Sequence, residues 1–96
     1  MATALTSENV HDAWSALREE VRTAVLLTMR HGRPFGSHVP HVFGSDWTRA
    51  YLHLSRLAFH TQHLLADPRL SLFISEPDGP EKNPLALRRI NLQGEA

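Results

Sequence analysis

The chain has 96 residues, of which ten are basic (Lys and Arg) and ten are acidic. This length fits one small domain with one core, and the balanced charge gives no strongly basic surface for nucleic acid or an anionic membrane. There is no cysteine, which excludes disulfides and thiolate metal sites, and no apolar run approaches the roughly 20 residues of a membrane span.

The N-terminal segment predicts a loose end followed by a helix. MATALTSENV lacks the basic start and long apolar stretch of a signal peptide, so we expect cytoplasmic placement, with residues 1–7 flexible. Ser7 can cap a helix over residues 8–20. Spacings of four, three and four place four apolar residues on one stripe of this helix: Val10, Trp14, Leu17 and Val21.

A hairpin is predicted next. Residues 22–30 (RTAVLLTMR) have an apolar centre typical of a buried strand. Residues 31–34 (HGRP) predict a turn, because glycine adopts positive φ and proline fixes φ. Residues 35–43 are then expected to form the partner strand. Pro40 cannot donate to a sheet, so it marks an edge or a bulge. The small Gly36-Ser37 pair would let a ligand approach the backbone.

Residues 50–75 predict a strand, a helix and a second strand, around which the other elements are arranged. Residues 51–55 alternate with the period of a half-buried strand. A helical stripe follows: Leu57, His60, Thr61 and Leu64, with Leu65 beside it. Asp67-Pro68 ends the helix, because the residue before proline is disfavoured in the α region. A second alternation then begins, with Leu70, Leu72 and Ile74 on one face.

Ser55 lies where the first of these strands gives way to the helix, beside Arg56 and near His60. A hydroxyl at this point can cap the helix, and a helix start offers free N–H groups and a positive dipole end to an anion. The simpler interpretation is a cap next to a solvated charge. Our hypothesis is that a phosphate group binds here.

The last part of the chain predicts a long loop and a final strand. Residues 76–87 hold three prolines and one glycine, a composition typical of functional or mobile loops. Within residues 88–96, Ile90 and Leu92 face one way and polar residues face the other. The expected fold is mainly β (α+β), an antiparallel barrel or roll with one N-terminal and one mid-chain helix.

The buried strand, the HGRPFGS turn, LHLSRLAFHTQHLLADPRLSLFI and RRINLQGEA together resemble the FMN-binding split barrel of pyridoxamine 5'-phosphate oxidase-like proteins. The closer resemblance is to the haem-utilisation branch, which carries a similar LS-x-L-x-x-H-T-x-N-L-x-x-D-P-R-x-S-L signature. It covers about residues 21–96. It implies a single domain over residues 1–96, with the barrel over residues 22–96.

The resemblance further implies a homodimer with FMN at the interface, acting as a flavin-dependent oxidoreductase on a small-molecule substrate. The expected cofactor contacts are Ser37, His38, Val39, Pro40, Leu54, Ser55, Arg56, His60 and Arg89, of which Arg56 follows from its place beside Ser55 and the others from the resemblance. The first four match the strand that touches the flavin, and the next four lie at or near the phosphate. The last matches a polar contact to the flavin. No residue is assigned a catalytic role, because the flavin itself carries the chemistry.

The chain also departs from the family. His63 stands where the closest branch usually has Asn, and the phosphate-binding arginine of the oxidase branch is not at Ser37. The oxidase's C-terminal substrate-binding segment is absent, which leaves enzyme activity open. The sixth barrel strand is not accounted for after Gly94. We therefore expect either a shortened chain or closure of the barrel by the partner chain.

The seven histidines allow other interpretations. His53, His60 and His63 could form a zinc site, but no carboxylate at ligand spacing accompanies them, so no metal is expected. One histidine could ligate haem. A non-catalytic protein that binds haem or a haem product on the same fold is therefore the second hypothesis, and a structural dimer without ligand is the third. Three aromatic residues are expected in the core or at a dimer contact: Trp14, Trp47 and Phe59.

Overall fold

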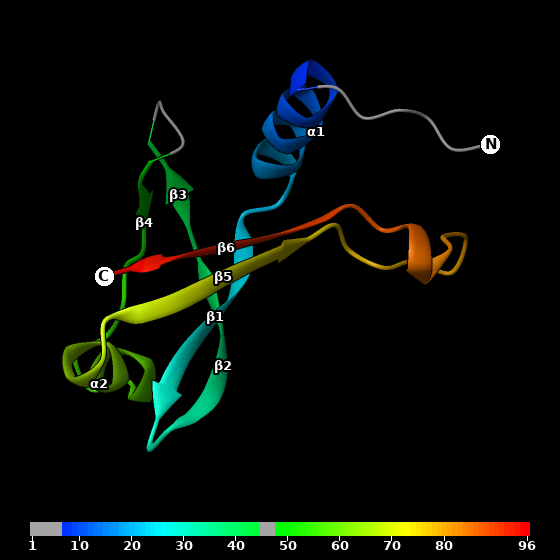
Figure 1. Cartoon of the computed structure of the whole chain (residues 1–96). Coiled ribbons are helices and arrows are strands. Elements are labelled where there is room, and N and C mark those ends of the chain that lie inside the picture. Colours follow the sequence, from blue (N-terminus) through cyan, green and yellow to red (C-terminus); the bar gives the residue numbers. More distant parts are fainter. Residues whose placement is uncertain (1–6, 45–47) are drawn as a thin grey trace.

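The computed structural model describes residues 7–44 and 48–96, with side chains from residue 12 onward. In chain order the elements are α1 (Ser7–Glu20), β1 (Thr23–Arg30), β2 (Arg33–Pro40), β3 (Val42–Phe43), β4 (Ala50–Tyr51), α2 (Phe59–Ala66), β5 (Arg69–Ser75), a 3₁₀ turn (Pro84–Ala86) and β6 (Arg89–Glu95) (Figure 1). Four strands form a sheet in the order β2-β1-β5-β6, while β3 and β4 form a separate ribbon. All described pairings are antiparallel. This confirms the expected mainly β fold with two helices.

The hairpin of β1 and β2 is the longest pairing, running from Thr23 opposite Pro40 to Arg30 opposite Arg33. Its turn has positive φ at both central residues, 51° at His31 and 76° at Gly32. Such two-residue turns match the right-handed twist of the strands that they join. The turn is shorter than predicted, because the residues after Gly32 already belong to β2.

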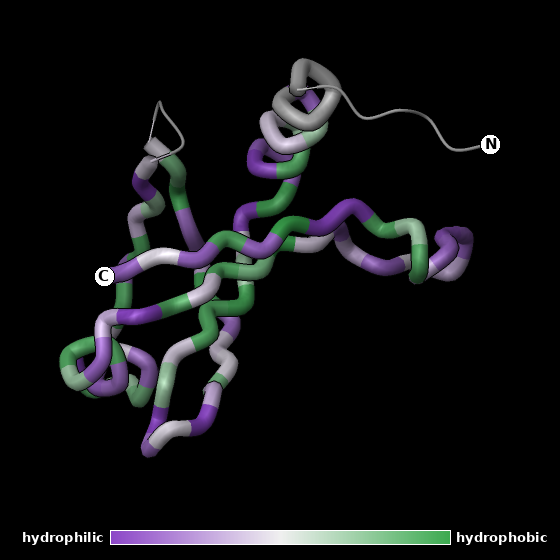
Figure 2. The backbone as a smooth tube through the Cα atoms, viewed as in Figure 1, coloured by the Kyte–Doolittle hydropathy of each residue, from purple (hydrophilic) through white to green (hydrophobic). Residues whose placement is uncertain are grey.

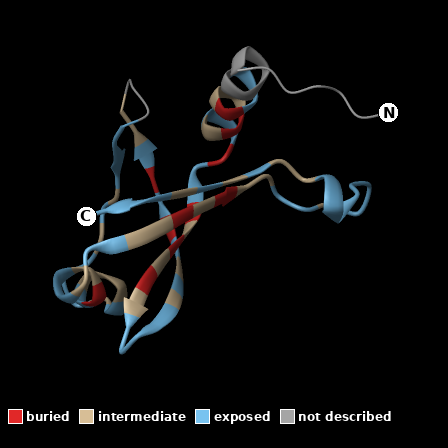
Figure 3. Cartoon of the chain, in the orientation of Figure 1, coloured by how far each residue is buried: buried red, intermediate tan, exposed pale blue. Residues whose placement is uncertain are grey.

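One face of the sheet is covered by α1, the β3–β4 ribbon and α2. The predicted stripe of α1 is confirmed from Trp14 onward. The buried apolar core consists of Trp14, Leu17, Val21, Ala24, Leu26, Val39, Leu72 and Ile74. Residues of the ribbon, of α2 and of the segment that joins them pack against its rim: Phe43, Leu52, Leu54 and Leu64. Figure 3 shows the buried residues gathered on α1, β1 and β5.

The segment before α2 differs from the prediction. The expected strand over residues 51–55 is reduced to Ala50–Tyr51, although burial still alternates as far as Ser55. The helix begins at Phe59, two residues later than predicted, because residues 56–58 turn before it. It ends at Ala66, as Asp67-Pro68 predicts.

The buried side of α2 also differs in part. Leu57 is 92% exposed and Leu65 is 78% exposed, so neither lies on a buried stripe. His63 is the residue of α2 that is buried, with His60 and Leu64 half-buried beside it. The physical reason is the contact that α2 makes: it meets β1 through a polar bond between His63 and Thr28, and not through a row of leucines.

The last two strands agree with the prediction. β5 places Leu72 and Ile74 in the core, and β6 places Ile90 and Leu92 half-buried on the same face. The loop between them carries the 3₁₀ turn and extends away from the rest of the molecule (Figure 1). The Arg88 guanidinium ties its base to Glu76 at 3.1 Å and to Glu20 of α1.

Some expectations lie outside the described residues. These are the flexible end over residues 1–6, the Val10 side chain and the placement of Trp47. Ser7, expected as the flexible cap residue before a helix over residues 8–20, is instead the first residue of α1. Phe59, expected in the core or at a dimer contact, is 63% exposed.

Candidate functional site

The segment predicted to touch a flavin is the second half of β2, which is an edge strand. β2 pairs with β1 alone among the described strands, so its outer edge presents backbone N–H and C=O groups to a ligand. Val39 points into the core and is 2% exposed, whereas His38 and Pro40 are exposed. Val39 can therefore offer only its backbone, and His38 can offer its imidazole.

Ser55 and Arg56 form a corner that is tied to α2. The Thr61 hydroxyl donates to the Ser55 carbonyl, and the Gln62 side chain donates to the Arg56 carbonyl at 2.7 Å. The Ser55 hydroxyl accepts from the Leu57 N–H at 3.3 Å. The expected helix cap at Ser55 is therefore wrong, because this hydroxyl closes a turn that precedes the helix.

The first turn of α2 has two features of an anion site. Its N-cap residue, Ala58, has no side chain that could accept from the first N–H groups, and the positive dipole end of a helix favours negative charge. In addition, Nε2 of half-buried His60 is buried without a hydrogen-bond partner among the described residues. Exposed Arg56 precedes this turn. Together these groups can hold a phosphate or a carboxylate.

This corner adjoins the start of β2. The ring of Phe35 lies 6.3 Å from that of Phe59 and 4.9 Å from that of His63, in edge contacts. Since Phe35 precedes Ser37 by two residues, α2 and the edge of β2 are neighbours.

Arg89 lies apart from them. It begins β6, on the opposite edge of the sheet from β2, so three strand spacings, roughly 14 Å, separate the two edges. Its guanidinium donates a long hydrogen bond, of 3.4 Å, to the Leu85 carbonyl. Within one chain, the predicted contacts therefore do not form one enclosed site.

Leu54 lines a different feature, a hollow of about 440 Å³ between the ribbon, α2 and the ends of β5 and β6. Its apolar wall is formed by Phe43, Leu52, Leu54, Leu64, Leu70, Leu72 and Leu92. The sequence predicted Leu54 as a phosphate neighbour, and the structure places its side chain toward this apolar hollow.

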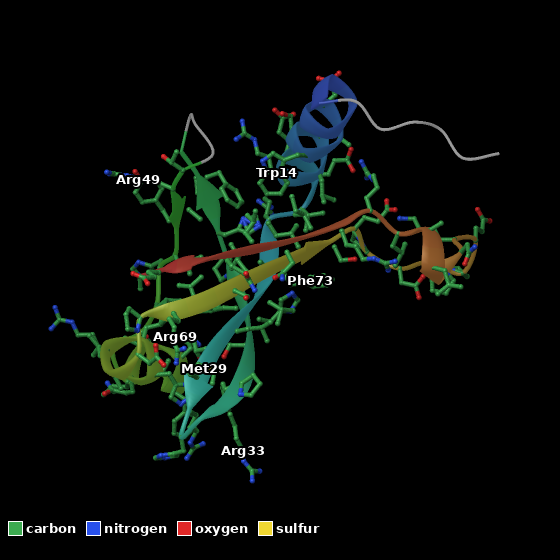
Figure 4. All side chains as sticks on the ribbon, in the orientation of Figure 1. Trp14, Met29, Arg33, Arg49, Arg69 and Phe73 are labelled. Atoms are coloured by element: carbon green, nitrogen blue, oxygen red, sulfur yellow. The ribbon has the colours of Figure 1, made fainter. Side chains whose placement is uncertain are left out.

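The face of the sheet opposite the helices is open, and we call it the open face. Its centre is apolar and half-buried, with Val25, Leu27 and Met29 on β1 and Phe73 on β5. Val25 is paired on one side with His38 and on the other with Phe73, so these three form one row across the sheet. Figure 2 shows the hydrophobic runs along β1 and β5, and Figure 4 shows the side chains of Met29, Arg69 and Phe73 along the sheet.

Because Gly36 has no side chain, the open face is shallow beside this row. A Cβ on Gly36 would lie 3.4 Å from Leu27 Cδ2 and 3.5 Å from Val25 Cγ1. A hollow of about 540 Å³ on this side of the sheet is lined in part by Leu27, Met29 and Ser71. Gly36, which was predicted to let a ligand approach the backbone, thus borders an apolar surface that a flat group can approach.

Two buried histidines were not predicted as such. His63 Nδ1 lies 2.9 Å from the Thr28 hydroxyl, and His41 is 7% exposed between α1 and the ribbon. Burial lowers the pKa of both, and Arg30, His31 and His60 lower that of His63 further. In the sequence, the spacing of three residues places His63 on the same helix face as His60 but does not show that His63 is buried, and nothing marks His41 as buried.

The histidines do not form a metal centre in the part of the chain that the structure describes. No three His, Asp or Glu side chains lie close enough there to hold a metal ion. In the same residues, neither helix has the length and apolar character needed to cross a bilayer.

No family model and no curated protein sequence matches this chain. Solved structures do match it. The haem storage protein HutZ from Vibrio cholerae has 25% identity and a TM-score of 0.75 over 88% of this chain. A haem-binding protein from Mycobacterium smegmatis has 28% identity and a TM-score of 0.76 over 97% of the chain.

A protein of unknown function from Agrobacterium tumefaciens, with 21% identity and a TM-score of 0.69 over 99% of this chain, shares the fold. The chain spans less than two thirds of these proteins, namely 58% of HutZ, 37% of the mycobacterial protein and 41% of the third. The predicted split-barrel fold is thereby confirmed, and among the proteins that share it are a haem storage protein and a haem-binding protein.

Proposed function

We propose that this chain is a haem-binding protein without catalytic activity of its own. The observation that carries the proposal is the likeness to two haem proteins at 25% and 28% identity, with TM-scores of 0.75 and 0.76. The open face supports it, since haem needs a flat apolar surface, an axial ligand for the iron and cations for its propionates.

His38 is the histidine best placed to be the axial ligand. It is exposed on the edge strand, in one row with Val25 and Phe73. Gly36, which has no side chain, lies two residues before it on the same face. By contrast, the side chains of His41 and His63 are buried. Arg89, exposed at the opposite edge, would hold a propionate. When bound, haem supplies the iron, and the protein supplies its ligand and a dry surface.

We also propose that two copies pair through their open faces. The apolar centre of this face is only half-buried in one chain, and the groups named for ligand binding lie at both edges of the sheet. A facing copy would cover the apolar row and enclose a ligand between two sheets. The predicted homodimer follows from this arrangement, and cytoplasmic placement stays a prediction.

Haem titration of the purified protein tests the proposal. We expect a Soret band that saturates with haem, and loss or a clear shift of that band in His38→Ala. His53→Ala is the matched control, because His53 is also exposed but belongs to the segment before α2. A protein that gives no saturable Soret change, or a His38→Ala variant that binds like the wild type, would contradict the assignment.

The alternative is FMN, and one observation favours it. The start of α2 next to the edge of β2 has no side-chain cap, and Nε2 of His60 has no hydrogen-bond partner in the described part of the chain, a combination that suits an anion. FMN would place its phosphate there, with Arg56 and Ser55 beside it, and its ring against the backbone of residues 37–40. Bound FMN would supply hydride or electron transfer.

An FMN titration separates the alternative from the haem proposal. Binding would quench flavin fluorescence, and it would weaken in Arg56→Gln and His60→Gln. His38→Ala would leave the contacts to the FMN phosphate unchanged. If haem binds and FMN does not, the alternative is wrong while the haem proposal stands.

A further inference from the structure

A small hollow between the last turn of α1 and β3 is not used by either proposed ligand. It has a volume of about 400 Å³ and is lined by Arg18, Glu19, Arg22, His41, Val42, Phe43 and Gly44. Its walls combine polar side chains from the helix with the edge of the β3–β4 ribbon. We refer to it as the α1–β3 hollow.

His41 lines this hollow. It is 7% exposed, and neither of its ring nitrogens has a hydrogen-bond partner among the described residues. The backbone N–H of His41 donates to the Arg22 carbonyl at 3.1 Å, and its ring packs edge-on against Phe43 at 5.1 Å. The imidazole is thus fixed in place, with a donor and an acceptor both left unused.

Arg18, which also lines this hollow, has an unused hydrogen-bond donor as well. Arg18 is half-buried, and its Nη1 is buried without a partner in the part of the chain that the structure describes. A buried donor of this kind destabilises the protein when it stays unpaired. With Arg22 and Glu19, the hollow has two guanidinium groups and one carboxylate, which leaves one net positive charge.

We propose that the α1–β3 hollow is a binding site for a small oxyanion, held by Arg18, Arg22 and the imidazole of His41. A guanidinium fork matches phosphate and carboxylate oxygens in geometry. The neutral imidazole donates one further bond and can accept one from a hydroxyl of the ligand, such as the P–OH of a phosphate monoanion. Glu19 limits the charge of the ligand, because a dianion would face its carboxylate.

Titration of the ligand-free protein with inorganic phosphate, and separately with acetate, tests this inference. Imidazole resonances observed by NMR should show a saturable shift for His41, larger than those of the exposed His38 and His53. Arg18→Gln should weaken the binding roughly tenfold or more, since a charge-assisted bond is worth about 1.5–3 kcal/mol. Arg33→Gln, which changes an exposed arginine of the hairpin, should leave it unchanged.

The two titrations also identify the ligand class. Stronger binding of phosphate points to a phosphoryl group, and stronger binding of acetate points to a carboxylate. His41→Phe keeps the ring packing against Phe43 and should abolish the site in a folded protein, with folding checked by circular dichroism. No saturable His41 shift, or equal shifts in wild type and Arg18→Gln, would overturn the proposal and leave the hollow as a site for water. Neither outcome depends on haem or FMN binding.

Discussion

The Thr28 hydroxyl and the Nδ1 atom of His63 lie 2.9 Å apart and form a buried bond between β1 and α2. Thr28 is 1% exposed and His63 is 8% exposed. The ring of His63 is further held by an edge contact to Phe35 and a stacked contact to Phe59. This one polar pair therefore fixes how α2 sits against the hairpin, and so where the corner at Ser55 and His60 lies.

The first prediction concerns this pair. Thr28→Val keeps the shape of the side chain but removes the hydroxyl, which leaves a buried imidazole nitrogen unpaired. We expect the free energy of unfolding to fall by about 1 kcal/mol or more, measured by chemical denaturation. Thr23→Val, at an exposed position of the same strand, should change it little. The double variant Thr28→Val/His63→Leu should recover part of the loss, because no unpaired polar group remains; a larger loss would contradict this account.

A second prediction concerns pH. Burial lowers the pKa of His41 and of His63 in the folded protein, with Arg30, His31 and His60 acting further on His63. As pH falls below the usual histidine value of about 6.5, the unfolded chain binds protons before the folded one does, so stability is lost. We expect the melting temperature to be level above pH 7 and to decline between pH 6.5 and 5.

Carboxyl groups change the stability at lower pH than the histidines do, so the two contributions can be measured separately. A side-chain hydrogen bond from Arg69 lowers the pKa of Asp67, and the Arg88 backbone N–H lowers that of Glu76. Their stabilising effect is lost only in more acidic solution, below their ordinary values of 3.8 and 4.5. The double variant Thr28→Val/His63→Leu should decline less between pH 6.5 and 5 than the wild type, and an equal decline would show that His63 is not involved.

Local patterns were enough to predict most of the fold. The burial of Trp14, Leu17 and Val21, the alternation of β5 and β6 and the end of α2 before Asp67-Pro68 follow from periodicity and backbone sterics, which short stretches of sequence contain. The split barrel itself came from resemblance, because the pairing of β1 with β5 joins residues far apart in the chain.

The candidate site was less accessible to prediction. Ser55 looked like a cap because it precedes a helical pattern, but the three residues after it turn first, and only the packing of α2 decides where the helix begins. Similarly, a histidine in the middle of a helix is usually exposed. His63 is buried because Thr28 supplies its partner from a distant strand, and no local signal in the sequence indicates that partner.

The third prediction concerns the hairpin turn. Gly32 has φ of 76°, and a Cβ added there would meet no heavy atom within 4 Å. Gly32→Ala should therefore lower the free energy of unfolding by about 1 kcal/mol through the backbone alone. Gly79→Ala is the matched control, since Gly79 does not have positive φ and its nearest neighbour is the Lys82 side chain at 3.8 Å. Equal effects of the two substitutions would show that the φ angle of Gly32 is not the cause.

The fourth prediction tests the proposed pairing of open faces. Leu27→Glu places a carboxylate in the apolar centre of the open face, where a facing copy would bury it without a partner. The isolated chain should tolerate the change, because Leu27 is half-buried on the side of β1 opposite the core. We therefore expect native mass spectrometry to show dimer for the wild type and monomer for Leu27→Glu, with an unchanged circular dichroism spectrum. Leu85→Glu adds the same charge at a residue that is 82% exposed in the loop between β5 and β6, and it should stay dimeric. If both variants remain dimeric, the copies meet through another surface and the ligand site is not between the open faces.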